Sequence, residues 1–385
     1  MSSLFQLFIF ILSTTLTHSI SYDHECGDDP SNLWLDVVVL VDNSKNITDA
    51  NLYLIASNIV ELFGQKTRIG TTYSDPRSTR VGLVTYNQEA TIVADLNKFQ
   101  SFDDLYATTY FTLFDVADTD QSFLAKGLQA AEQVLRSGRS NNYRNNYKQM
   151  IIVYTALYQG TGNLNPMPVA TRLKNSGINI AVVDMISYID DMALNMNLQN
   201  IASEDMFYNY GTHTYNYLFG VMCQVNCFCR DSWTRFLAFG DHPTGVCLQV
   251  SNGTTNWSVA KLACQNSVKK GYLVTDFNSD KHGFLQDLIQ SSTGSMSGYH
   301  IGLNFVNGAW YWQQAVGQPL NSLTSSNQQN DILWNSGYPR SASSNTGVAT
   351  ISDSDGTGWE NINPYNNNQY YICEVNTCDT DNYCA

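Results

Sequence analysis

The sequence predicts an α/β fold with a doubly wound parallel sheet over residues 33–220, followed by an α+β domain over residues 229–374. Strand-length apolar runs alternate with helical patterns in the first half. Tryptophan, tyrosine, glycine and asparagine become dense in the second half, where short strands are implied. Eight of the nine cysteines lie from Cys223 onward, so we expect disulfides to support mainly the second domain.

The strands of the first domain are expected to be buried on both faces, because they are β-branched and almost continuously apolar. They are Leu35–Val41, Val81–Tyr86, Met150–Thr155 and Ile178–Met185. A helix is predicted between the second and third strands, since Leu124, Leu128, Ala131 and Leu135 recur on one helical face. Alternating strands and helices favour a parallel sheet covered on both sides, with ligands beyond the carboxyl ends of the strands.

The second domain begins with two predicted helices. Trp257, Ala260, Cys264 and Val268 share one face of the first helix. Asn278 is placed to cap the second helix. The apolar face of that helix carries Phe284, Leu285, Leu288 and Ile289. The strand sequences that follow are Tyr299–Asn304, Trp310–Trp312 and Tyr370–Glu374.

The N-terminus indicates export. Leu4–Leu12 is apolar, too short to span a bilayer but long enough for the core of a signal peptide. Small residues favour a cut after Ser19, although no basic residue precedes the apolar core. We therefore expect residues 1–19 to be a signal peptide, with a buried strand or a membrane anchor as the alternatives. The rest of the chain is expected to be secreted, with two domains and a cysteine-containing tail over residues 375–385.

The net charge and the absence of certain motifs argue against several classes of function. The formal net charge is −14, the opposite sign from that needed to displace phosphate counterions, so we expect no nucleic-acid partner. A basic amphipathic helix and a second apolar run of spanning length are missing, so no membrane insertion is expected. Neither G-x-S-x-G nor H-E-x-x-H occurs, and the six histidines are scattered singly. We predict a binding protein rather than an enzyme.

Asp42-Asn43-Ser44-Lys45-Asn46 follows the first strand and resembles the Asp-x-Ser-x-Ser cation loop of von Willebrand factor A domains. Gly127-Leu128, Ser176–Ile178 and Leu198–Ser203 extend this resemblance over about residues 33–220. It implies a divalent-cation site at Asp42, Ser44 and Ser122. The site is degenerate, because Asn46 replaces the second serine and Ala156 stands where a second aspartate belongs. We expect no cofactor and only weak or absent magnesium binding, with a working cation site as the alternative.

The helices and strands of the second domain, taken in order, resemble the C-type-lectin-like fold. This resemblance implies a Cys264–Cys373 bridge and an N-terminal hairpin bridge between Cys229 and Cys247. The other usual core bridge is missing, since Gly347 occupies one of its cysteine positions. We expect Cys26 to pair with Cys223 and Cys378 with Cys384, which leaves Cys227 free or intermolecular.

Sugar binding in that family uses a calcium ion held by a Glu-Pro-Asn or Gln-Pro-Asp tripeptide and a later Trp-Asn-Asp. Here Tyr338-Pro339-Arg340 replaces the tripeptide, and Trp359-Glu360-Asn361 the later motif. A fixed guanidinium beside the site would repel calcium. We therefore expect calcium-independent ligand binding, with rings available for stacking. The candidate ligand-binding residues are Trp334, Tyr338, Arg340, Trp359, Glu360 and Asn361.

Two binding functions remain open. The first is a secreted recognition protein for carbohydrate or microbial surface ligands, since the domain pairing resembles secreted nematode C-type lectin proteins associated with innate defence. The second is an extracellular adhesion or matrix protein that uses the A-like domain as a protein-interaction platform. Glycosylation sequons stand at Asn46, Asn252 and Asn256. The last two are too close together for both to be used easily.

Overall fold

The computed structural model describes residues 23–64, 66–140, 144–185, 192–240, 242–295, 298–323, 333–353 and 356–384. The predicted signal peptide, residues 1–19, lies outside this range. The chain forms two compact units. Of the described residues, those within 25–236, 243–247 and 376–384 form the A-like unit, and those within 23–24, 237–242 and 248–375 form the lectin-like unit. Among the described residues, none of the helices has the length and apolarity needed to cross a membrane.

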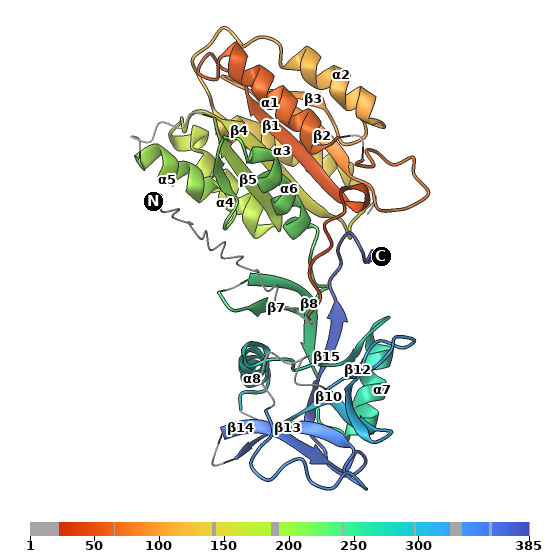
Figure 1. Cartoon of the computed structure of the whole chain (residues 1–385). Helices are drawn as coiled ribbons and strands as arrows, with labels where there is room; N and C mark the ends of the chain where they lie inside the picture. The colour runs from red at the N-terminus through yellow and green to blue at the C-terminus, as the bar shows by residue number, and fades with distance from the viewer. Residues whose placement is uncertain are drawn as a thin grey trace, which may run out of the picture. The chain divides into compact units, whose positions relative to one another are not determined.

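A six-stranded sheet forms the centre of the A-like unit (Figure 1), in the order β3-β2-β1-β4-β5-β6. All its strand pairs are parallel except the β2–β3 pair. The four predicted strands are confirmed to within two residues at each end. The strands are β1 (Leu35–Asp42), β2 (Arg80–Tyr86), β3 (Ala90–Ala94), β4 (Lys148–Thr155), β5 (Ile178–Asp184) and β6 (Phe207–Asn209).

Helices cover both faces of this sheet, as a doubly wound fold requires. Alternate residues of β1 point to opposite faces: Val39 packs with α1, α2 and α6, whereas Val38 and Leu40 pack with α3, α4 and α5. The predicted helix on Leu124 and Leu128 is α3. The helices are α1 (Asp49–Leu62), α2 (Phe102–Thr112), α3 (Leu124–Gly138), α4 (Pro166–Asn175), α5 (Met192–Ile201) and α6 (Thr214–Val225).

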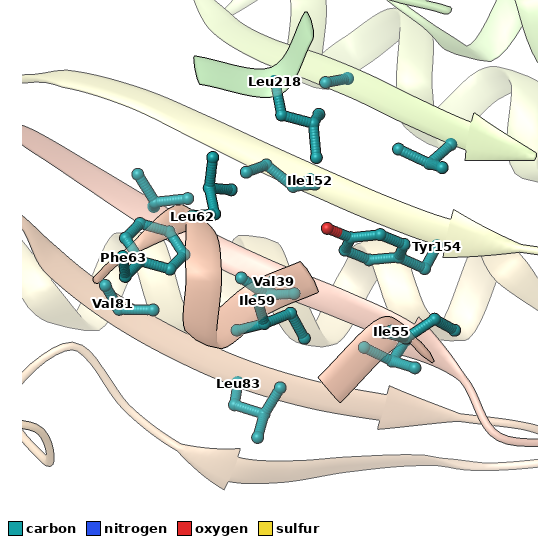
Figure 2. Packing of buried hydrophobic residues seen from close by; sticks show 14 of the residues in the cluster. Val39, Ile55, Ile59, Leu62, Phe63, Val81, Leu83, Ile152, Tyr154 and Leu218 are labelled. Carbon is teal, nitrogen blue, oxygen red and sulfur yellow. The ribbon is translucent and has the colours of Figure 1, made fainter. Parts of the chain in front are cut away.

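Figure 2 shows the core between α1 and the sheet. Ile55, Ile59 and Leu62 of α1 lie over Val39 and Ile152 of the strands. Helical spacing places the three α1 side chains on one face, and each is at most 2% exposed. Apolar packing therefore stabilises the sheet. The sheet in turn fixes the carboxyl ends of β1 and β4, where the candidate metal loop lies.

The lectin-like unit contains both predicted helices, α7 (Trp257–Ser267) and α8 (Ser279–Thr293). Asn278 caps α8 as predicted, since its side chain accepts the backbone N–H of Lys281 at 2.8 Å. The associated sheet has the order β12-β11-β10-β15-β8-β7, with β13 pairing β10 and β14, and β9 pairing β15. Its strands are β7 (Thr234–Ala238), β8 (His242–Val250), β9 (Tyr272–Leu273), β10 (Tyr299–Val306), β11 (Ala309–Trp312), β12 (Asn321–Ser322), β13 (Gly347–Asp353), β14 (Gly356–Ile362) and β15 (Tyr370–Asn376).

The structure forms three of the four expected disulfides. Cys264–Cys373, Cys229–Cys247 and Cys378–Cys384 are bonded as expected.

The fourth expected pair, Cys26–Cys223, is wrong: Cys26 bonds to Cys227 and leaves Cys223 as a free, buried thiol. Cys223 lies within α6, where its side chain joins the apolar core, whereas Cys227 follows the residue that ends the helix. Burial raises the pKa of the Cys223 thiol to about 12, so it stays protonated at neutral pH.

Candidate ligand-binding sites

The metal loop, Asp42–Asn46, lies at the carboxyl edge of the A-like sheet. Asp42 is fully buried, and both of its carboxylate oxygens are engaged. Oδ1 accepts the backbone N–H of Ser44 at 2.9 Å, and Oδ2 accepts the hydroxyl of Ser122 at 2.7 Å. Burial raises the pKa of the Asp42 carboxyl, while these hydrogen bonds act in the opposite direction. The structure thus brings the three candidate metal residues together and connects them by hydrogen bonds.

Asn46 closes the metal loop. Its Nδ2 donates to the Ser44 hydroxyl at 3.3 Å and to the Asp120 carbonyl at 2.8 Å. An N–H group therefore faces one of the oxygens that a cation would need. Ala156, directly after β4, is buried and has no side-chain oxygen. Since Mg²⁺ requires near-octahedral oxygen ligands, usually with carboxylates, the residues present do not fit it.

A second layer of polar groups lies behind the metal loop, and sequence reasoning missed it. The Tyr86 hydroxyl donates to Thr155 Oγ1 at 2.9 Å, and the Thr155 hydroxyl donates to the Leu157 carbonyl at 3.0 Å. Burial raises the pKa of Tyr86, and the nearby Asp42 charge raises it further. One signal was available, because Tyr86 and Thr155 each end an apolar strand at this edge of the sheet. The groups behind Asp42 are thus hydrogen-bonded to one another, as Asp42 is to Ser44 and Ser122.

In the lectin-like unit, Asn361 fixes the backbone of Arg340. The buried Asn361 amide accepts the Arg340 N–H at 2.7 Å and donates to the Arg340 carbonyl at 2.9 Å. The Arg340 guanidinium carbon lies 4.4 Å from the centroid of the Tyr338 ring, within cation–π distance. The loop therefore presents an exposed cation stacked on a half-buried phenol.

Glu360 is also engaged locally. Asn335 Nδ2 donates to Glu360 Oε1 at 3.1 Å and to the Ile351 carbonyl at 3.2 Å. Calcium takes six to eight oxygen ligands, and here the Asn361 amide is already bonded to the backbone of Arg340. The adjacent guanidinium adds repulsion. The residues present do not fit a calcium site.

The two candidate tryptophans differ in exposure. Trp359 is fully buried, with ring centroids 5.5 Å from Trp312 and 5.7 Å from Trp334. Its ring faces are not available to a ligand, contrary to the expectation, because the indole N–H finds its acceptor in the interior, at Asp276 Oδ2, 2.7 Å away. Trp334 is half-buried against Trp310. Of the two rings, Trp334 is the one that can contact a ligand.

Sequence reasoning also missed two buried polar groups of this unit. Asp276 Oδ2 lies 2.7 Å from His282 Nδ1, in addition to its contact with Trp359. Burial alone would lower the pKa of His282, but the hydrogen bond and the charge of Asp276 raise it above its ordinary value of 6.5. Nothing in the local sequence distinguishes Asp276 from an exposed loop aspartate.

The second missed group surrounds Lys281, which is fully buried on α8. Its Nζ lies 2.5 Å from Asp23 Oδ1 and 3.0 Å from Glu374 Oε2, and it donates to Thr275 Oγ1 at 2.9 Å. Burial disfavours the charged form of Lys281 and so lowers its pKa, but the charges of Asp23 and Glu374 raise it above its ordinary value. These contacts stabilise the fold of the lectin-like unit and leave the amine no room for a ligand.

The sequence matches two family models, the von Willebrand factor type A domain over residues 36–218 and the lectin C-type domain over residues 253–375. The chain therefore contains a von Willebrand factor type A domain followed by a lectin C-type domain, as the sequence predicted. Among curated proteins it is similar to C-type lectin domain-containing protein 160 of Caenorhabditis elegans, with 24% identity over 383 residues. That match covers 94% of this chain and 56% of the relative, so the chain spans about half the relative's length.

Solved structures resemble parts of the chain. Proximal thread matrix protein 1 from the mussel byssus has 19% identity and a TM-score of 0.41, covering 52% of this chain and 48% of that one. The C-type lectin domain of murine dendritic cell inhibitory receptor 2 has 20% identity and a TM-score of 0.29, covering 39% of this chain and 99% of that one.

Proposed function

We propose that this protein is a secreted recognition protein that binds carbohydrate or microbial surface ligands without calcium, and that it acts in innate defence. The observation that carries the proposal is the use of the Asn361 amide, which holds the backbone of Arg340 on both sides. The oxygen that a calcium site would need is thereby committed to the loop. The role in defence rests on resemblance to nematode lectin proteins and on no residue of the site.

The binding surface would consist of Tyr338, Arg340, Glu360 and the exposed part of Trp334. A phenol and a half-buried indole offer ring faces or edges for stacking on a sugar or packing on a protein. The guanidinium donates several hydrogen bonds in a fixed plane, which suits hydroxyl or carboxylate acceptors.

Glycan-array binding of the full-length secreted protein tests this function. We expect binding to be the same in EDTA and in calcium, and Tyr338→Ala with Arg340→Ala to abolish it. Tyr365→Ala is the matched control, because Tyr365 is 71% exposed in the same unit but outside this loop. Loss of binding in EDTA, with recovery in calcium, would contradict the proposal.

A second candidate function is adhesion through the A-like unit. Tyr106, Phe111 and Phe114, in and just after α2, are 49%, 87% and 74% exposed. Tyr53 of α1 is 61% exposed, and the Tyr110 ring contacts both Tyr53 and Tyr106. Exposed apolar patches mark protein-interaction sites. We expect Phe111→Ser with Phe114→Ser to reduce binding to immobilised extracellular matrix proteins while glycan binding is retained. Unchanged matrix binding would contradict the adhesion function.

We also propose that Asn252 is the glycosylated sequon of the lectin-like unit. Asn252 is exposed, whereas Asn256 is half-buried and its Oδ1 caps α7 by accepting the Val259 N–H at 3.1 Å. The Asn46 amide is engaged inside the metal loop. Glycosidase treatment of the secreted protein should lower its mass, and Asn252→Gln should remove most of that difference. A mass unaffected by Asn252→Gln would contradict this assignment.

A further inference from the structure

A cavity of about 320 Å³ opens at the amino edge of the A-like sheet, at the opposite ends of the strands from the metal loop. Lys148 and Gln149 begin β4, and Ser176 and Gly177 directly precede β5. Its volume lies at the lower end of the range for small-molecule sites. The lining includes Arg139, Lys148 and Arg230, with Asp231 as the one acidic residue.

These three cations are unusual in a chain with a net charge of −14. None of them forms an ion pair with any residue that the structure describes. Arg139 donates one guanidinium N–H to the Tyr147 carbonyl, and its buried Nε has no hydrogen-bond partner among the described residues. Lys148 Nζ lies 4.4 Å from the centroid of the Phe228 ring, a contact that leaves its hydrogen-bonding capacity unused.

Helix C-termini near the cavity do not supply the missing acceptors. α3 ends beside Arg139 and α4 ends beside Ser176, and free carbonyls there would attract cations. Backbone N–H groups already bond those carbonyls: Arg139 to Arg136 and Ser137, Ser176 to Arg172 and Leu173, and Gly177 to Lys174. Two polar side chains of the lining are also bonded, Ser176 Oγ to the Leu173 carbonyl at 2.8 Å and Gln149 Nε2 to the Leu135 carbonyl at 3.3 Å. Arg139 Nε and Lys148 Nζ have no hydrogen-bond acceptor among the described residues and remain available.

Burial disfavours the charged forms of two of these cations, Lys148 and Arg139. It lowers the pKa of Lys148, and the neighbouring Arg139 lowers it further, against the raising effect of Asp231. Burial also lowers the pKa of Arg139. A bound anion would reverse both effects, since an opposite charge favours the protonated form.

We propose that this cavity binds the anionic group of an acidic sugar, either a sulfate or a carboxylate. The guanidinium of Arg139 has the planar fork that recognises such oxyanions, and Lys148 adds a point charge. The cavity has room for more than the oxyanion itself, and Phe228 gives it an apolar wall against which a sugar ring can pack. The site lies in the A-like unit and requires no cation, so it is independent of the lectin-loop function proposed above.

The test is calorimetric titration of the full-length protein with three disaccharides: one sulfated, one carrying only a uronate, and one neutral. We expect saturable binding of at least one acidic disaccharide and none of the neutral one. Lys148→Gln should weaken binding by about tenfold, the size of one charge-assisted hydrogen bond, and addition of Arg139→Gln should abolish it. Arg136→Gln is the matched control, because Arg136 is exposed on α3, lies outside the cavity lining and carries the same charge.

The choice of sulfate or carboxylate follows from which acidic disaccharide binds. Equal binding of the neutral disaccharide, or no saturable binding of either acidic one, would overturn the proposal. So would equal weakening by Lys148→Gln and Arg136→Gln, because that would indicate nonspecific charge attraction. Lys148→Gln keeps the test valid if the Arg139 variant fails to fold, since the Lys148 amine contacts the Phe228 ring and forms no ion pair with the described residues.

Discussion

The two units bury their charged groups in different places. In the A-like unit, the buried charges lie at the two edges of the sheet. Asp36 pairs with Arg80 at 2.7 Å and with Arg144 at 3.1 Å at the amino edge, and Asp42 bonds Ser122 at the carboxyl edge. The strands between them are apolar, with all eight residues of β1 buried.

In the lectin-like unit, charged and polar groups lie inside the core. Lys281 pairs with Glu374 and Asp276 with His282, and both pairs are buried. Aromatic rings contact them: Phe277 lies against Lys281, and Trp359 donates to Asp276. Apolar packing is non-directional, but a buried charge needs its particular partner. We therefore expect single polar substitutions in the core of the lectin-like unit to be more damaging than one at the metal loop of the A-like unit. Four predictions test this difference.

The largest effect is expected from loss of the Cys264–Cys373 bridge. The two cysteines are 109 residues apart, for which the chain-entropy model gives roughly 4–5 kcal/mol. Cys264→Ser should sharply reduce the secreted yield and lower the melting temperature of the lectin-like unit. Cys223→Ala is the control, since Cys223 forms no bridge. Equal yield and equal melting temperature for Cys264→Ser and wild type would show that the bridge is dispensable.

Removal of the Lys281 charge should have a slightly smaller effect. Lys281→Met leaves Asp23 and Glu374 as buried carboxylates without their cation, a change that costs about 3–5 kcal/mol. Urea unfolding of the full-length protein measures it. Lys269→Met, at an exposed lysine, should change the unfolding free energy by less than about 0.5 kcal/mol. Similar values for the two variants would argue against the buried ion cluster.

The His282–Asp276 pair should make stability depend on pH. The folded-state pKa of His282 is raised, so its contribution is fully present below the ordinary value of 6.5 and is lost as pH rises through the folded-state pKa. The size should be that of a hydrogen bond to a charged group, about 1.5–3 kcal/mol. His282→Gln should flatten the profile between about pH 5 and 8, whereas His242→Gln, at an exposed site, should not. A wild-type profile without this decline would refute the assignment.

The smallest effect is expected at the metal loop. Because burial raises the pKa of Asp42, its ionised form destabilises the folded state at neutral pH. Asp42→Asn should therefore leave stability within about 1 kcal/mol of wild type or increase it slightly. Asp118→Asn, at a side chain 94% exposed, makes the same charge change as a control.

Magnesium titration by calorimetry accompanies that comparison. Wild type should release no binding heat at millimolar magnesium. A well-defined site of micromolar affinity, abolished by Asp42→Asn, would contradict the hydrogen-bonded description of the loop.

The elements that sequence reasoning predicted are those that depend on local apolar patterns. The central strands of the A-like sheet, and the helices α3, α7 and α8, follow from periodicity. The two strands at the sheet edges do not: β3 has mostly exposed or half-buried residues, and β6 has three residues. The partner of Cys26 depends on where α6 ends, which the spacing of Cys223 and Cys227 does not specify.

The candidate sites show the same limit. Tyr338 and Arg340 are neighbours in sequence, so their proximity was predictable. The burial of Trp359 depends on Asp276, 83 residues away, and no local pattern indicates that contact. The cavity around Lys148 joins residues from five separate parts of the chain.

The position of Asp23 has a consequence for biosynthesis. Asp23 is translated 258 residues before Lys281, with which it pairs, and Glu374 follows much later. During vectorial synthesis the whole A-like sheet emerges from the ribosome first, and the N-terminal carboxylate must stay accessible until α8 has been made. A chain started at residue 229 would contain Lys281 and Glu374 but not Asp23, leaving the buried ammonium one carboxylate instead of two. Expression of this lectin domain should therefore retain the N-terminal segment, in the same chain or as an added peptide.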